Sequence, residues 1–213
     1  FSTKHFNANT IPWYEFIVGR NPGYPERMLD TNHALIDQQL RRLRSDEGDP
    51  RNWDKIHHID GYLDTVDAQV DGYNIHLWQE FCPVYFESLV QLMWGAPTHI
   101  THGGLQFASV RYFDADAQRP GLPASVAALV DGISAEGISV TLVNTGDQPR
   151  TVVEQEGSFR EHRFDRATLV DADGEAEATA KVGSEWLEVA LAPHAIARLR
   201  LEITRFANDP SYE

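Results

Sequence analysis

Residues 98–104 (THITHGG) contain the residue types that most directly suggest chemistry. His99 and His102 flank Ile100 and Thr101, and Gly103 and Gly104 follow them. An imidazole can act as a general acid or base near neutral pH, and a glycine pair lets a ligand or another chain approach the backbone closely. We therefore take His99 and His102 as candidate catalytic residues. The alternative is that the two imidazoles cap a neighbouring helix.

A metal site would need further ligands beside these two histidines. His57, His58, His76 and Glu80 are possible donors, and His76 and Glu80 are one helical turn apart. The chain contains no HExxH sequence and no other established ligand spacing. No metal or other cofactor is therefore predicted, and a metal-dependent enzyme using a histidine cluster is the weakest of three hypotheses.

Two carboxylates, Glu80 and Glu87, are also candidate catalytic residues because both lie in apolar sequence. Their separation of seven residues is two helical turns, which would place them on one helix face. Glycoside hydrolysis uses such a pair, and burial would raise the pKa of both groups. The alternative is that both lie on the wet edge of a helix or pair with Arg111.

Aromatic side chains could form a platform for carbohydrate, because sugar rings stack on the faces of Trp and Tyr. Among the tryptophans, only Trp186 lies in the second half of the chain, and all the others precede Gly95. Trp78 and Trp94, with Arg111, are the candidate substrate-binding residues, and core packing is the alternative role for the aromatic residues. The aromatic segment 11–19 (IPWYEFIVG) is expected to pack onto another part of the chain.

Helical periodicity dominates the first hundred residues. Apolar residues recur at three- and four-residue steps over about 25–45 and again over 59–70, which predicts two amphipathic helices. A third helix is expected over about 74–94, with a kink or a new start at Pro83 and a stop at Gly95. These helices would position the candidate carboxylates and tryptophans.

The second half alternates apolar and polar residues in short runs. Six such runs lie between Ile138 and Ile203, with Gly, Pro, Asn or Asp in the gaps, and 105–113 reads as a first strand. Asp173-Gly174 is a hairpin signal, and 196–203 should be a strand with one wet face. The predicted fold class is α+β: a helical N-terminal half, 1–104, followed by an antiparallel β-sandwich, 105–213.

Composition excludes several function classes. The formal net charge of −14 argues against nucleic acid and anionic membranes as partners, since phosphate binding needs a basic face. No segment is long and apolar enough to span a bilayer, and the single cysteine, Cys82, has no intrachain partner for a disulfide. Phe1 suggests that the chain begins inside a longer product, and the location is open, with a preference for the cytoplasm.

The strand series 138–153, closing with VALAPHAIARLRLEI at 189–203, resembles the C-terminal β-sandwich of multidomain glycoside hydrolases. The resemblance implies that the chain is the C-terminal part or a subunit of a carbohydrate-active hydrolase, with a mainly structural sandwich. The implied partners are a carbohydrate substrate and the remainder of the same protein or another subunit. A non-catalytic binding or assembly module is the alternative.

Overall fold

The computed structural model describes residues 10–46, 49, 82–85, 87–96 and 108–211. The chain divides into two compact units. One consists of Phe1–His5 and Glu26–Ser88, and the other of Phe6–Pro25 and Leu89–Glu213. Within the described ranges, no helix has the length and apolar character needed to cross a membrane.

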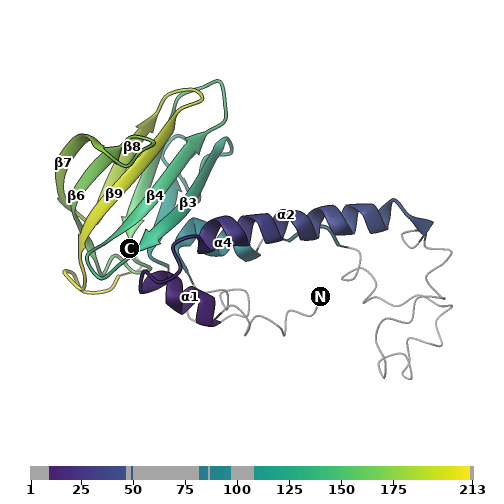
Figure 1. Ribbon diagram of the computed structural model, residues 1–213. Coiled ribbons are helices and arrows are strands. Elements are labelled where there is room, and N and C mark those ends of the chain that lie inside the picture. Colours follow the sequence, from purple (N-terminus) through teal and green to yellow (C-terminus); the bar gives the residue numbers. More distant parts are fainter. Residues whose placement is uncertain (1–9, 47–48, 50–81, 86, 97–107, 212–213) are drawn as a thin grey trace. The chain divides into compact units, whose positions relative to one another are not determined.

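Three helices lie in the described residues: α1 (Thr10–Ile17), α2 (Tyr24–Leu43) and α4 (Glu87–Trp94) (Figure 1). Helix α2 confirms the helix expected over 25–45. Its first turn carries Glu26 and its last turn carries Arg41 and Arg42, so both ends complement the helix dipole. The amphipathic stretch expected over 59–70 lies outside the described residues.

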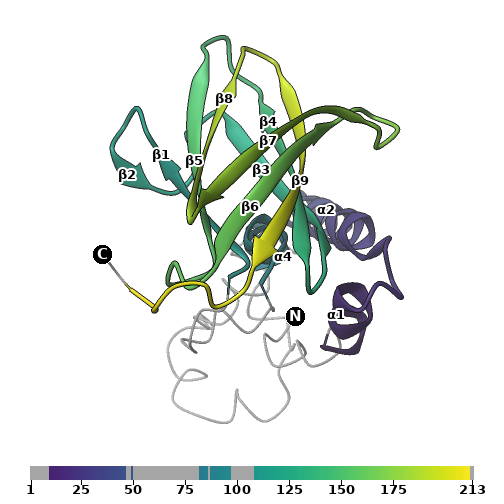
Figure 2. The same ribbon diagram turned by 90° about the vertical axis from the view of Figure 1, so that its left-hand side faces the viewer.

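In the described part of the chain, nine strands form two antiparallel sheets. The four-stranded sheet has the order β2-β1-β5-β8, and the five-stranded sheet has the order β3-β4-β9-β6-β7 (Figures 1 and 2). The strands are β1 (Val110–Asp114), β2 (Arg119–Pro120), β3 (Val126–Ile133), β4 (Gly137–Asn144), β5 (Arg150–Glu156), β6 (Arg163–Val170), β7 (Ala176–Ser184), β8 (Trp186–Leu191) and β9 (Ile196–Thr204).

The core lies between the two sheets because every second residue of the central strands points inward. On β9 the buried residues are Ala197, Leu199, Leu201 and Ile203, while Arg200 and Glu202 between them are exposed. This alternation confirms the strand expected at 196–203. Strand β9 pairs with β4 and β6, which makes it a central strand of the five-stranded sheet.

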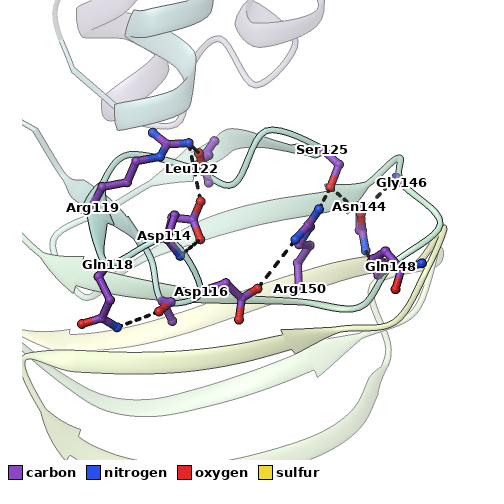
Figure 3. Close-up of polar contacts among 12 residues, drawn as sticks. Asp114, Asp116, Gln118, Arg119, Leu122, Ser125, Asn144, Gly146, Gln148 and Arg150 are labelled. Carbon is purple, nitrogen blue, oxygen red and sulfur yellow. Dashed lines mark hydrogen bonds and ion pairs between the residues drawn. The ribbon is translucent and has the colours of Figure 1, made fainter.

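Asn144 fastens one end of the sandwich, where the chain crosses between the sheets. Its buried side-chain Nδ2 donates to the carbonyl oxygens of Gln148 (2.8 Å) and Ala192 (3.0 Å). Its Oδ1 accepts from Ser125 Oγ (3.1 Å) and Gly146 N (3.0 Å), as Figure 3 shows in part. The β4–β5 and β8–β9 connections are thereby held to each other.

The predicted fold class must be corrected, because the N-terminal half is not a helical half. The described residues contain more strand than helix, and two of their three helices have only eight residues. Of the helix expected over 74–94, with a kink or a new start at Pro83, the last part is confirmed: α4 begins at Glu87 and ends at Trp94, directly before Gly95. Residues 82–85 have no regular structure, and residues 74–81 lie outside the described part of the chain. Proline lacks a backbone N–H and disfavours helical geometry in the residue before it, so apolar periodicity on its two sides does not make one helix.

The β-sandwich expected in the second half is confirmed. The expected boundary between 104 and 105 lies outside the described residues and stays a prediction. The loop after β1 contains the two-residue strand β2, which pairs with the end of β1.

Candidate functional site

Three of the seven candidate site residues lie in the described part of the chain. Glu87 is the first residue of α4. Trp94 is the last residue of that helix, and its half-buried ring packs against the sandwich core, as in the core-packing alternative. Arg111 is on β1. The other four, Glu80, His99, His102 and Trp78, lie outside the described residues and stay predictions.

Arg111 belongs to a row of side chains on the outer face of the four-stranded sheet. The strand register places it beside Gln155 of β5, which in turn lies beside Trp186 of β8. The Arg111 guanidinium donates to the carbonyl oxygen of Ser158 (3.1 Å). This row joins a predicted substrate-binding arginine to the one tryptophan of the sandwich, a pairing that the register alone reveals.

Two neighbours restrict the Trp186 ring. The ring of Phe113 meets it edge to face at a centroid distance of 5.5 Å, and the Arg160 guanidinium lies 5.7 Å from its centroid. Such a cation–π contact holds a cation over the indole. Trp186 is therefore part of a packed aromatic and cationic surface rather than a bare platform for a sugar ring.

Sequence reasoning missed a pair of carboxyl groups in the sandwich interior. Glu154 and Glu156 on β5 are both almost fully buried, and neither Glu154 oxygen has a hydrogen-bond partner among the described residues. Burial raises the pKa of each to about 8, and for Glu156 the charge of Glu154 acts in the same direction. The sequence did indicate that these carboxyl groups are buried, because alternation along TVVEQE places Glu154 and Glu156 on the same side of β5 as the buried Val152.

Glu161 and His162 lie close to Glu156 and not at a sheet edge. Strand β6, which follows them, pairs on both sides, and both side chains are buried. His162 Nδ1 accepts a hydrogen bond from Phe206 N (3.0 Å), and its Nε2 lies 3.8 Å from Glu161 Oε1. Burial lowers the pKa of His162, which favours the neutral ring.

A cavity of about 10 Å³ lies between Glu156, His162 and Arg205. This is about the space that one water molecule requires. A sugar ring does not fit there, so the geometry does not support these groups as the acid and base of a glycosidase. Within the described ranges, no group of three or more His, Cys, Asp or Glu side chains is arranged to hold a metal ion.

Larger hollows lie on the outer face of the five-stranded sheet. One, of about 160 Å³, is lined by charged and hydroxyl side chains of β3, β4 and β9, including Asp131, Thr141 and Arg198. A neighbouring hollow of about 330 Å³ shares Ser139 and Arg200 with it. Neither hollow is lined by any of the site residues expected from the sequence.

Comparisons with known proteins give little further identification. Residues 1–90 match a family model described as a domain of unknown function, DUF8034, which is less than half of the chain. No curated protein matches the chain. A solved structure from Bacillus halodurans C-125, provisionally assigned as an alpha-N-acetylgalactosaminidase, is similar at 17% identity and a TM-score of 0.28.

The match covers 45% of this chain and 21% of that protein, so the chain spans about a fifth of its length. The likeness does not identify an activity.

Proposed function

We propose that the chain is the C-terminal part or a subunit of a carbohydrate-active hydrolase, in which the sandwich is mainly structural. The order of the strands in sequence suggests the enzyme class, through the resemblance described above. The proposed role of the sandwich is supported by a single observation: of its two interior carboxyl groups, Glu154 is fully buried, and Glu156 borders a cavity that holds no more than about one water molecule.

Glycoside hydrolysis needs two carboxyl groups on opposite sides of a bound sugar. Since a sugar has no room beside Glu154 and Glu156, the catalytic pair of such an enzyme would come from outside the sandwich. We therefore propose that the remainder of the same protein or another subunit supplies it, with a carbohydrate as substrate. Glu80, Glu87, His99 and His102 remain candidates for a contribution from this chain.

A non-catalytic assembly module is the second candidate, and one observation favours it. Helix α1 and the residue after it expose three apolar side chains at helical spacing, Ile11, Tyr14 and Val18. An exposed apolar stripe of this kind is typical of a contact with another protein surface.

The test compares the chain alone with the chain isolated from its native cells by an affinity tag. Both preparations are assayed against a panel of α- and β-linked nitrophenyl glycosides, and co-purifying proteins are identified by mass spectrometry. We expect hydrolysis only by the native preparation. Glu154→Gln should leave its specific activity unchanged, because this carboxyl group is sealed in the core.

Hydrolysis by the chain alone that disappears in Glu154→Gln would overturn the structural role of the sandwich. A native preparation that hydrolyses no glycoside, but contains a stable partner, would favour the assembly module.

A further inference from the structure

The smaller hollow on the five-stranded sheet has a regular arrangement of polar groups. Arg198 and Arg200 are two residues apart on β9, so both point to the outer face. The register places Thr141 of β4 beside Arg198 and Ser139 beside Arg200. Each of the two guanidinium groups on β9 therefore has a hydroxyl residue beside it on β4.

Acceptors complete the lining of this hollow. Asp131 of β3 accepts a hydrogen bond from Thr141 Oγ1 (3.0 Å), and its charge interacts with Arg198. Asp171, at the β6–β7 turn, lies on the other side and uses Oδ1 to accept from the backbone N–H groups of Asp173 and Glu175. The hollow thus offers two carboxylates, and that of Asp131 lies near Arg198.

The two arginines differ in how far they are engaged. Arg200 donates to the carbonyl oxygen of Gly174 (3.2 Å). For Arg198, the described residues provide a charged neighbour in Asp131 but no hydrogen-bond acceptor. Its side chain is half-buried and lines the hollow, so its donors are available to a ligand. A guanidinium presents several donors in one plane, which suits recognition of two acceptors at once.

The charges decide the ligand class. The two aspartates and two arginines that line the hollow balance, so an anion or a cation alone gains little from it. A hydroxyl group both donates and accepts, and two adjacent hydroxyl groups can therefore satisfy an arginine and a carboxylate together. We propose that this hollow binds a neutral sugar or polyol through adjacent hydroxyl groups.

This inference does not depend on the hydrolase assignment, because it rests on donors and acceptors on the surface of the sandwich. The binding is expected to be weak, since no aromatic side chain is among the lining residues to stack on a sugar ring. The adjoining hollow of about 330 Å³ would let a longer saccharide extend past Ser139 and Arg200.

The test is a two-dimensional NMR titration of the intact chain with D-galactose, D-glucose and mannitol, and separately with glycine and inorganic phosphate. We expect saturable shifts of the backbone amides of Ser139, Thr141 and Arg198 with at least one of the neutral compounds. Arg198→Ala should raise its Kd at least tenfold, the loss of about one charged hydrogen bond. Lys181→Ala removes an exposed cation from β7 of the same sheet and should leave the Kd within about twofold.

Arg198→Lys is a second variant that keeps the charge and the fold but lacks the planar pair of donors, and it should also weaken binding. Three results would overturn the proposal: no saturable shift with any neutral compound over its full soluble range, a Kd that neither Arg198 variant changes, or tighter binding of glycine or phosphate than of every neutral compound.

Discussion

Glu154 is a carboxyl group in a hydrocarbon environment, with Tyr112 opposite on β1 and Glu156 two residues further along β5. An ionised carboxylate without hydrogen bonds is costly there, so the neutral form is favoured. The pKa of both glutamates is raised to about 8 in the folded chain, from an ordinary value of 4.5. The folded state therefore holds protons that the unfolded chain releases between these two values.

The pH dependence of stability follows from this difference. As pH rises from about 4.5 to about 8, the unfolded chain loses protons first, so the stability conferred by the neutral carboxyl groups is lost over that window. Each group contributes a slope of up to about 1.4 kcal/mol per pH unit. We expect the free energy of unfolding, measured with urea, to be higher at the acid end of this window than at its alkaline end.

Glu154→Gln should flatten this slope and make the chain more stable than wild type at the alkaline end, because the amide cannot ionise. Glu177→Gln is the matched control, since Glu177 is exposed on β7. The interpretation fails if wild type and Glu154→Gln show the same pH profile.

The second prediction at the scale of one residue concerns Asn144. Its side chain is fully buried and forms four hydrogen bonds, two of them to backbone carbonyl oxygens. Asn144→Ala leaves these buried groups unpaired and should cost about 3 kcal/mol of unfolding free energy. Asp147→Ala, in the same connection, removes a 90% exposed carboxylate paired with His194 and should cost less than about 1 kcal/mol. Equal losses for the two variants would contradict a fastening role for Asn144.

Strand β9 leaves no room for a Cβ atom at Gly137, the first residue of β4. A Cβ added to Gly137 would lie 2.3 Å from the carbonyl oxygen of Leu201, and this backbone atom cannot move away without disturbing the strand pair. Gly137→Ala should therefore destabilise the sandwich by more than about 2 kcal/mol. Thermal and urea unfolding of the purified variant measure this.

Gly183 provides the comparison, because an added Cβ there meets nothing within 4 Å and only its φ of 72° opposes the change. Gly183→Ala should cost roughly 1 kcal/mol. If the two alanine variants were equally stable, the close approach of Gly137 to β9 would not limit the structure.

Prediction from sequence succeeded where the residues of a single strand or turn are enough to identify it. The alternation at 196–203 and the Asp173-Gly174 turn were visible because one face of β9 is buried and because Gly174 has a φ of 84°. The same alternation places Arg198 and Arg200 outward. Their shared hollow with Asp131 was not predictable, since it depends on the register between β3, β4 and β9, which no short-range pattern encodes.

Prediction was less accurate for the helices, whose start or existence the local sequence pattern did not define. A kink or a new helix start was expected at Pro83, but the backbone at 82–85 is not helical and α4 begins only at Glu87. Helix α1 was missed because its sequence carries aromatic residues on one side and has no acidic first turn or basic last turn. Two of its aromatic side chains, Trp13 and Phe16, do pack as expected, on Tyr24, with centroids 5.9 and 5.6 Å from that ring, whereas Tyr14 is exposed.

At the scale of the whole molecule, the net charge of −14 favours solubility, whereas the surface of α1 does not. The buried side of this helix is the cluster of Trp13 and Phe16 with Tyr24. Its other side exposes Ile11 (69%), Tyr14 (55%) and Val18 (43%) to solvent. Three large apolar side chains at helical spacing form a stripe that a partner protein would cover.

The chain on its own should therefore associate through this stripe. We expect light scattering to show a mean mass that rises with protein concentration and rises further with salt, because salt screens the repulsion between negatively charged chains. The double variant Ile11→Lys and Tyr14→Lys places cations on the stripe and should keep the chain monomeric at unchanged thermal stability. Val84→Lys is the control, since Val84 is an equally exposed apolar residue (65%) outside α1. A wild-type chain that stays monomeric, or one whose association Val84→Lys abolishes and the α1 variant does not, would show that α1 is not the contact surface.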